Sequence, residues 1–266
     1  KCKNYLKEGI WKTYYPDGTL KSEGKFQEGL CEGKHVEYGV NGNVLWIIYY
    51  TKGKQDGPYY TFNEKGDTIV RSYFSMGVLN GFYHESWPGV STTGHYINGK
   101  KEGLWIIDQQ TRVDSVYYAN DKKQGRSIYY FNGKPHHVRY YKDDKLAGQY
   151  LKYNEKDGSL VSEEYYKKGI QDSVARVFDH GRLYREYWLD NGKPCKHDIT
   201  YFSNSDSIRE AVYYRSTGSI MHFITYNSSG KLSRQTWFGI DKPDSLKAYD
   251  NNGKLSSMHA YLKCSF

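Results

Sequence analysis

The stretch Gly9-Ile-Trp11-Lys-Thr-Tyr14-Tyr-Pro-Asp-Gly18-Thr-Leu20 decides the fold, because versions of it return about every 23 residues. Each version opens on one residue, often glycine. It places a large side chain two residues later and another five residues later, followed by a turn glycine and often an aliphatic residue. A repeat this short cannot form a domain by itself, so the chain is predicted to be one stacked array. The eleven frames open at Gly9, Gly33, Gly57, Gly81, Gly103, Gly125, Gly148, Ser173, Lys196, Met221 and Asp244.

Each frame predicts one β-hairpin. Runs rich in Tyr, Trp, Phe, Val and Ile are typical of half-buried strands. The segments between them, such as Pro16-Asp17-Gly18 and Asn41-Gly42, contain residues that tight hairpin turns require. No window shows apolar residues at helical spacing. We therefore expect an all-β fold, an elongated single-layer antiparallel β-meander or solenoid of about eleven tandem hairpins that occupies residues 1–266 as a single domain.

The aromatic residues are expected to stabilise this thin sheet. Side chains alternate across a strand, so rings at positions two and five of a frame are predicted to lie on opposite faces. Tyrosine suits a single layer without a thick aliphatic core, because its ring is apolar and its hydroxyl can stay hydrated. The 29 tyrosines are therefore interpreted as structural first.

The charge is basic, with a formal net value of +8 from 38 Lys and Arg against 30 Asp and Glu. Many lysines follow turn glycines, where they are expected to solvate turns and protect sheet edges. The alternative is a row of cations that attracts an anionic surface. No apolar run is long enough to span a membrane as a helix. The chain starts at Lys1, which leaves room for a leader upstream, and the Tyr- and Asn-rich composition slightly favours export to the periplasm or cell surface over the cytoplasm.

No catalytic, cofactor or metal signature is found, so the sequence predicts a protein that is not an enzyme. The segment Gly94-His-Tyr-Ile-Asn-Gly99-Lys100 resembles the start of a P-loop, but Lys101 stands where Ser or Thr must hold magnesium. The nine histidines do not show the spacing of a zinc site. The cysteines form no disulfide framework, and only one pair is near enough in sequence to consider. The four cysteines are Cys2, Cys31, Cys195 and Cys264, and the pair is Cys2 with Cys31.

The fourth to sixth frames depart most from the template. The first turn of the fourth frame reads Trp87-Pro88-Gly89, and that of the fifth reads Gln109-Gln110-Thr111-Arg112. An irregular frame in a repeat array marks a bend or a binding site, or is simple repeat drift. A ligand or partner groove here is predicted to use four aromatic side chains as stacking surfaces, and these are Trp87, Tyr96, Trp105 and Tyr118.

The pattern from Gly9 through Gly18 and Leu20 to Gly24, Phe26 and Gly29 resembles the bacterial variant of the MORN repeat, including the YwqK-type antitoxin-like proteins. The resemblance covers residues 9–261 and weakens after Ser173, where the opening glycines are lost. It implies a β-hairpin sheet used for protein association or as a scaffold near membranes, and it supplies no catalytic residues. The tandem Gly-x-Gly of eukaryotic MORN repeats is missing from most frames.

Two classes of function follow as hypotheses. The first is a non-enzymatic repeat scaffold, in which an aromatic and basic face binds a protein partner. The alternatives are a cell-envelope module that binds carbohydrate or anionic lipid through exposed rings, and an antitoxin-like protein that neutralises a toxin. Nucleic acid is not an expected partner, and the pattern does not predict an oligomeric state.

Overall fold

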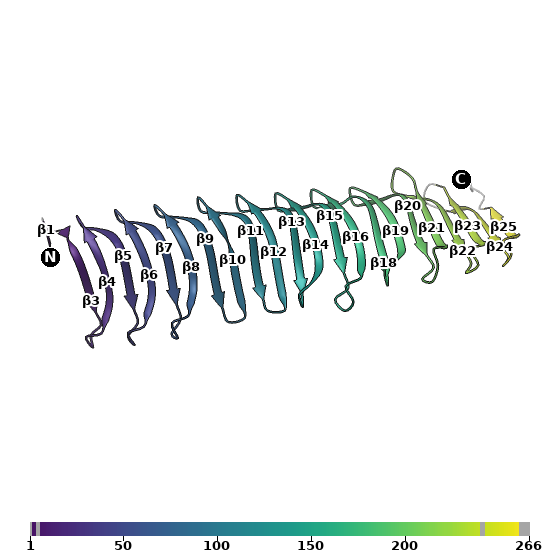
Figure 1. Cartoon of the computed structure of the whole chain (residues 1–266). Coiled ribbons are helices and arrows are strands. Elements are labelled where there is room, and N and C mark those ends of the chain that lie inside the picture. The colour runs from purple at the N-terminus through teal and green to yellow at the C-terminus, as the bar shows by residue number, and fades with distance from the viewer. Residues whose placement is uncertain (1, 4–5, 240–242, 261–266) are drawn as a thin grey trace. The chain divides into compact units, whose positions relative to one another are not determined.

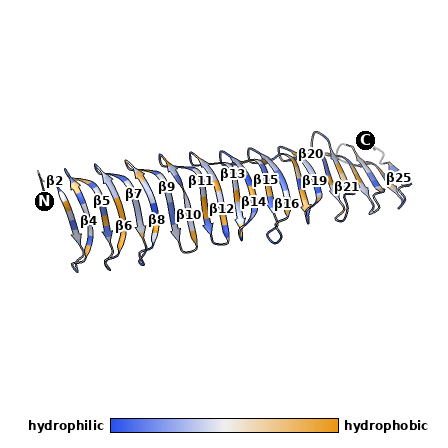
Figure 2. Cartoon of the chain, in the orientation of Figure 1, coloured by the Kyte–Doolittle hydropathy of each residue, from blue (hydrophilic) through white to orange (hydrophobic). Residues whose placement is uncertain are grey.

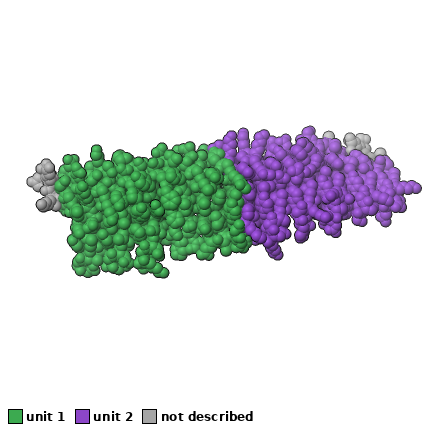
Figure 3. Space-filling model, in the orientation of Figure 1, with its two compact units in different colours: residues 1–133 green, residues 134–266 purple. Residues whose placement is uncertain are grey.

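The computed structural model describes residues 2–3, 6–239 and 243–260. Those residues form strands and turns and contain no helix, and hence no helix long and apolar enough to cross a membrane. The chain divides into two compact units, residues 1–133 and 134–266 (Figure 3). The division falls at Gly133, the turn glycine of the sixth frame, and not in a linker between frames.

The first unit is an antiparallel meander in which the strands from β3 to β13 each pair with their neighbours in sequence (Figure 1). A separate two-stranded pair, β1 and β2, precedes it. The bounds are β1 Cys2–Lys3, β2 Leu6–Lys7, β3 Gly9–Tyr14, β4 Leu20–Gln27, β5 Leu30–Tyr38, β6 Val44–Thr51, β7 Lys54–Phe62, β8 Thr68–Ser75, β9 Val78–Trp87, β10 Val90–Ile97, β11 Lys100–Gln109, β12 Arg112–Ala119 and β13 Lys122–Phe131.

The second unit has the same architecture. Its strands again pair in sequence order, except that β16 pairs with both β17 and β18 across a short interruption. The bounds are β14 Lys134–Lys142, β15 Lys145–Tyr153, β16 Leu160–Lys167, β17 Ile170–Gln171, β18 Ser173–Asp179, β19 Arg182–Asp190, β20 Lys193–Tyr201, β21 Ile208–Tyr214, β22 Ile220–Tyr226, β23 Leu232–Phe238, β24 Pro243–Tyr249 and β25 Leu255–Ala260. The predicted all-β, single-layer meander of hairpins is confirmed in each unit.

The turns form because their residues favour turn conformations, as the sequence predicts. In the first hairpin Tyr15 N donates to Thr19 O at 2.8 Å and Gly18 N donates to Tyr15 O at 2.9 Å. Gly18 has a φ of 89°, in the left-handed region that a side chain disfavours. The Asp17 carboxylate accepts from Thr19 N at 2.8 Å and closes the turn. In the fourth and fifth frames the longer strands β9 and β11 run on to Trp87 and Gln109, so their turns are shorter.

One face of the first unit carries a row of contacting rings, which we call the ring face. Neighbouring rings along it meet mostly edge to face, with centroids 4.9 to 6.4 Å apart, in an arrangement that aromatic pairs favour. The rings are those of Trp11, Phe26, His35, Tyr50, Tyr59, Phe74, Tyr83, Tyr96, Trp105 and Tyr118. They come from position two of their frames and from position seventeen, or position fifteen for Tyr96 and Tyr118. Figure 2 shows that hydrophobic residues are spread over strands of both units.

Two strand glycines make room for this row. A Cβ added at Gly24 would lie 2.1 Å from His35, and one added at Gly94 would lie 2.1 Å from the Trp105 indole. Neither glycine has a positive φ, so close approach of a ring, and not backbone conformation, requires glycine at both positions.

Candidate functional site

The face opposite the ring face bears a set of exposed apolar side chains from the end of the third frame through the fifth frame, which we call the apolar strip. Cross-strand partners share a face, and the register pairs Leu104 with Tyr117 and Phe82 with His95. Side chains alternate along a strand, so Leu104 lies on the face opposite its neighbour Trp105, and Phe82 lies on the face opposite its neighbour Tyr83. Trp105 and Tyr83 belong to the ring face. The apolar strip consists of Tyr73 on β8, Phe82 on β9, Leu104 and Ile106 on β11, and Tyr117 on β12.

The apolar strip is solvent-exposed, whereas the ring face below it is packed. Phe82 and Tyr117 are 43% and 47% exposed, and Trp105 on the other face is 2% exposed. Single exposed apolar side chains are ordinary, but several on one face of a sheet indicate an interaction surface. Here β10, which lies between β9 and β11, contributes His95 and Thr93 to the same face. The exposed apolar area is therefore concentrated where the repeat is least regular.

Basic groups border the strip at Phe82. The Arg71 guanidinium lies 5.5 Å from the centre of the Phe82 ring, within the range of a cation–π interaction. The His84 ring stacks on Phe82 with centroids 6.4 Å apart, and His84 Nδ1 is 2.9 Å from Thr93 Oγ1. Arg71 and His84 are direct cross-strand partners, so both lie on the face of the strip. The strip thus combines apolar side chains with a guanidinium and an imidazole at Phe82.

Three of the four predicted site residues come together, but on the ring face. The Trp105 ring contacts Tyr96 with centroids 5.0 Å apart and Tyr118 with centroids 6.3 Å apart, and Tyr83 packs against it at 5.7 Å. Lys101 Nζ lies 4.4 Å from the centre of the same ring. The expectation that Trp105 offers a stacking surface to a ligand is corrected by its burial, because the indole is only 2% exposed.

Trp87, the fourth predicted residue, lies at the end of β9, four residues beyond Tyr83, or roughly 13 Å along the strand. It is 51% exposed, and its Nε1 donates to Glu85 Oε1 at 2.7 Å. It lines a shallow recess of about 320 Å³ together with Ser86, Ser91, Asp108 and Gln110. Trp87 is therefore available to a ligand.

Sequence reasoning missed the apolar strip because it followed the repeat template, in which Trp105 occupies the conspicuous position. The run Leu104-Trp105-Ile106-Ile107 contained the signal. Successive residues of a strand point to opposite faces, so a continuous apolar run places apolar side chains on both faces. The face opposite the ring face therefore also receives apolar side chains, which the repeat template does not predict.

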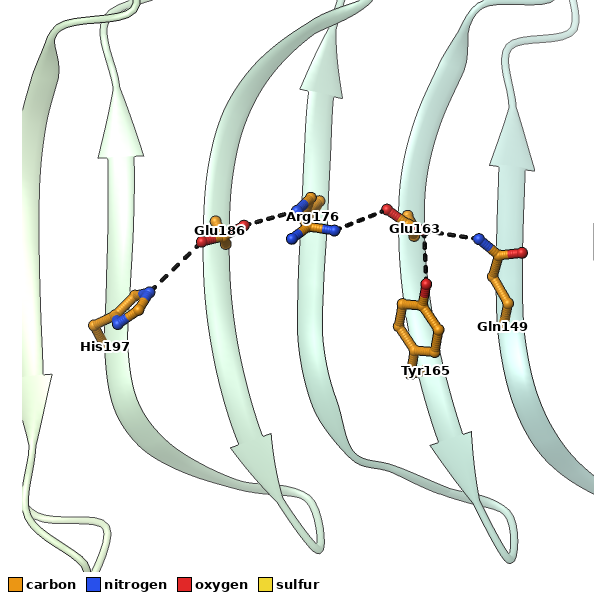
Figure 4. A network of polar contacts seen from close by, with 6 residues as sticks. All are labelled: Gln149, Glu163, Tyr165, Arg176, Glu186 and His197. Carbon is orange, nitrogen blue, oxygen red and sulfur yellow. Dashed lines mark hydrogen bonds and ion pairs between the residues drawn. The ribbon is translucent and has the colours of Figure 1, made fainter.

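The second unit contains a chain of polar contacts along one face (Figure 4). Arg176 donates to Glu186 Oε2 at 2.7 Å and to Glu163 Oε2 at 3.2 Å. His197 Nε2 lies 3.6 Å from the other oxygen of Glu186. Gln149 and Tyr165 donate to Glu163 Oε1 at 2.7 and 3.0 Å. Burial opposes ionisation of Glu163, but these donors and Arg176 outweigh it and lower the pKa of the carboxyl.

This polar chain is suited to holding strands together and not to acid–base chemistry. The hydrogen bonds to Glu186 and Glu163 outweigh desolvation and raise the pKa of Arg176, so the carboxylates are held as its charged partners. A general acid or base needs a pKa near the working pH, which this arrangement does not provide for Glu163. Within the described ranges, no group of three His, Cys, Asp or Glu side chains is placed to hold a metal ion.

The two cysteines whose side chains the structure describes, Cys31 and Cys195, are free thiols. Burial raises the pKa of each, which makes them poor nucleophiles. Cys264 and the side chain of Cys2 lie outside the described residues, and so does the considered pairing of Cys2 with Cys31.

Comparison with known proteins adds little to this geometry. No family model and no curated protein matches the chain. A solved structure of a mutant of S. aureus TarM in complex with fondaparinux, alpha-GlcNAc-glycerol and UDP is similar over 44% of this chain and 21% of that chain, at 16% identity and a TM-score of 0.20. The match therefore spans about a fifth of that protein, and a score this low does not extend to a shared fold.

Proposed function

We propose that this protein is a non-enzymatic repeat scaffold that binds a protein partner through the apolar strip. The observation that carries the proposal is the exposure of Phe82, Leu104, Ile106 and Tyr117 on one face of the first unit. Strand residues held by neighbouring hairpins present such a surface rigidly, so little conformational entropy is lost on binding. The resemblance to the bacterial MORN-repeat variant agrees with this role.

The chemistry of the strip specifies its partner. An interface centre rich in aromatic and aliphatic side chains takes an apolar partner surface, and the Arg71 guanidinium at its border takes an acidic residue. The net charge of +8 supports attraction to an acidic protein. We therefore infer a partner with an apolar patch bordered by Asp and Glu.

A photo-crosslinking experiment tests this proposal. A benzophenone amino acid is placed at Tyr117 or Ile106 in the native host, and at Ile220, an exposed apolar residue of the second unit, as the matched control. We expect one crosslinked protein species from Tyr117 and Ile106 and not from Ile220. With the captured protein purified, the variant Leu104→Ser/Tyr117→Ser should weaken binding at least tenfold, the equivalent of about 1.4 kcal/mol.

Two results of these experiments would contradict the proposal. Equal capture at positions 117 and 220 would show that crosslinking reports exposure alone. Equal binding of the variant and the unchanged protein would show that the strip is not the interface. Either result overturns the proposal, and circular dichroism of the variant confirms that its fold is retained.

A specific observation favours glycan binding as a second candidate. Trp87 is an exposed indole beside hydroxyl, carboxylate and amide groups of Ser91, Asp108 and Gln110, and this combination of a ring face with polar groups is suited to stacking against a sugar. Saturation-transfer NMR with cell-envelope oligosaccharides should show contact that Trp87→Ala abolishes. Tyr14→Ala, which removes an exposed ring from another frame, should leave the contact unchanged.

A further inference from the structure

One side chain in most repeats caps the backbone of the following turn. The acceptor belongs to the residue directly before the frame opens, and the donor is the N–H of the first residue of the next turn along that edge. We call these acceptors the capping residues. The pairs are Glu8 with Glu28 N at 3.0 Å, Glu32 with Lys52 N at 2.9 Å, Asp56 with Met76 N at 3.3 Å, Asn80 with Asn98 N at 3.1 Å and Glu102 with Asn120 N at 2.9 Å in the first unit, and Asp172 with Asn191 N at 3.2 Å in the second.

Ala147 occupies a capping position without a capping side chain. It directly precedes Gly148, the opening residue of the seventh frame, and the corresponding turn residue is Lys168. The backbone here keeps the geometry of the other turns. Gly169 N donates to Leu146 O at 2.8 Å, as Gly192 N donates to Gln171 O at 2.9 Å, and Lys168 has a φ of 54° like the capped turn residues. The turn is thus formed, but among the described residues no side chain accepts from Lys168 N as the capping residues do elsewhere.

A recess of about 580 Å³ lies where the side chain is missing. Ala147 and the Tyr166 ring contribute to its wall, and four lysines surround it with a single aspartate, Asp143. The lysines are Lys142, Lys145, Lys167 and Lys168. Tyr166 is oriented by its own hydrogen bond, because its hydroxyl donates to Glu164 Oε2 at 2.7 Å.

The four lysines outnumber the one carboxylate of the lining, Asp143. Lys142 and Lys145 are direct cross-strand partners, and like charges in that relation repel each other. Among the residues that the structure describes, none of the four lysines forms an ion pair within 4 Å. An anion in the recess would therefore relieve the repulsion and accept from the N–H of Lys168 at the same time.

We propose that this recess binds a carboxylate from outside the chain, which takes the place of the missing capping side chain. Five of the six capping residues named above are carboxylates, so the same backbone geometry already selects that group elsewhere in the molecule. The bound carboxylate accepts a hydrogen bond from Lys168 N and ion pairs from the surrounding lysines. The site belongs to the second unit and is independent of the apolar strip in the first.

The test uses the full chain and two probes that separate the possible sources of the group. Acetate represents a free small carboxylate, and the blocked peptide acetyl-Gly-Glu-Gly-amide represents a carboxylate side chain of a partner. The matched peptide with Gln in place of Glu is the neutral control. Amide NMR spectra are recorded during each titration. We expect a saturable shift of the Lys168 amide, with little change at Lys52, whose amide is already capped by Glu32.

The variant Ala147→Glu supplies the missing side chain from the chain itself. It should shift the Lys168 amide without ligand and weaken binding of both carboxylate probes at least tenfold, and Ala147→Gln controls for bulk without charge. Tighter binding of the Glu peptide than of acetate assigns the site to a protein side chain, and the reverse assigns it to a small metabolite. Absence of a saturable shift at Lys168, an equal shift with the Gln peptide, tighter binding of inorganic phosphate, or undiminished binding to Ala147→Glu would each overturn the proposal.

Discussion

Introducing a methyl group at Gly94 should destabilise the first unit by forcing the buried Trp105 ring out of position. A Cβ built at Gly94 lies 2.1 Å from Trp105 Cδ2 and 2.3 Å from Cε2. Carbon atoms in contact normally stay about 3.5–4.0 Å apart, so the indole must move by roughly 1.5 Å. Tyr83, Tyr96 and Tyr118 surround the ring, and it is 2% exposed, so that movement disturbs several packed contacts together.

The expected cost for Gly94→Ala is about 2–3 kcal/mol, at the upper end of the range for overpacking a core. Urea unfolding followed by circular dichroism measures this cost. Trp105→Leu reduces the clash, so the double variant should be more stable than the sum of the two single changes predicts, by about 1 kcal/mol or more. Gly24→Ala, which meets His35 at the same distance, should behave in the same way as Gly94→Ala.

Gly66→Ala provides the control. An added Cβ there meets no atom within 4 Å, but the φ of 87° strains any side chain. Its cost should therefore arise from the backbone and simply add to that of Trp105→Leu. The packing argument fails if Gly94→Ala changes the free energy of unfolding by less than about 0.5 kcal/mol. It also fails if Gly94→Ala and Trp105→Leu turn out to be additive.

Three further predictions concern the second unit. Burial, with the neighbouring positive groups, lowers the pKa of His137 from 6.5 to about 4, so the unfolded chain binds the proton more tightly than the folded chain does. The melting temperature should therefore fall as the pH drops from about 6.5 to 4. The variant His137→Asn should show a weaker dependence of the melting temperature on pH over the same range. Arg176→Met removes the cation between two half-buried carboxylates and should cost about 1–3 kcal/mol by urea unfolding, and adding Glu163→Gln should recover part of it. Asp172→Ala removes the cap on Asn191 N and should speed hydrogen exchange at that amide, while unchanged exchange would contradict the capping role.

The fold followed from local features of the chain. Turn segments such as Pro16-Asp17-Gly18 adopt the conformations that their residues favour, and the strands between them are rich in β-branched and aromatic residues. Because each hairpin pairs mainly with its neighbours in sequence, few long-range choices remain. The repeat period was therefore sufficient to predict a meander of hairpins.

The candidate site was less accessible to this reasoning. Trp87 was predicted to be a stacking surface within an irregular turn, and the structure places it, exposed, at the end of β9. Trp105 was interpreted as a surface ring, but the register sets it over Gly94 and buries it. Whether a ring is buried depends on the residue opposite it on the neighbouring strand, and spacing within a single frame does not determine that residue.

The sequence by itself determined the repeat, the strands and the positions of the turns, because backbone conformation depends on a few adjacent residues. The tertiary structure decided which face holds the packed rings and which face holds the apolar strip. It also distinguished Ala147 from six capping residues in the same frame position, since a missing acceptor becomes visible only beside the amide of Lys168, 21 residues further along the chain. Cross-strand register brings such groups together, and register is a property of the assembled sheet.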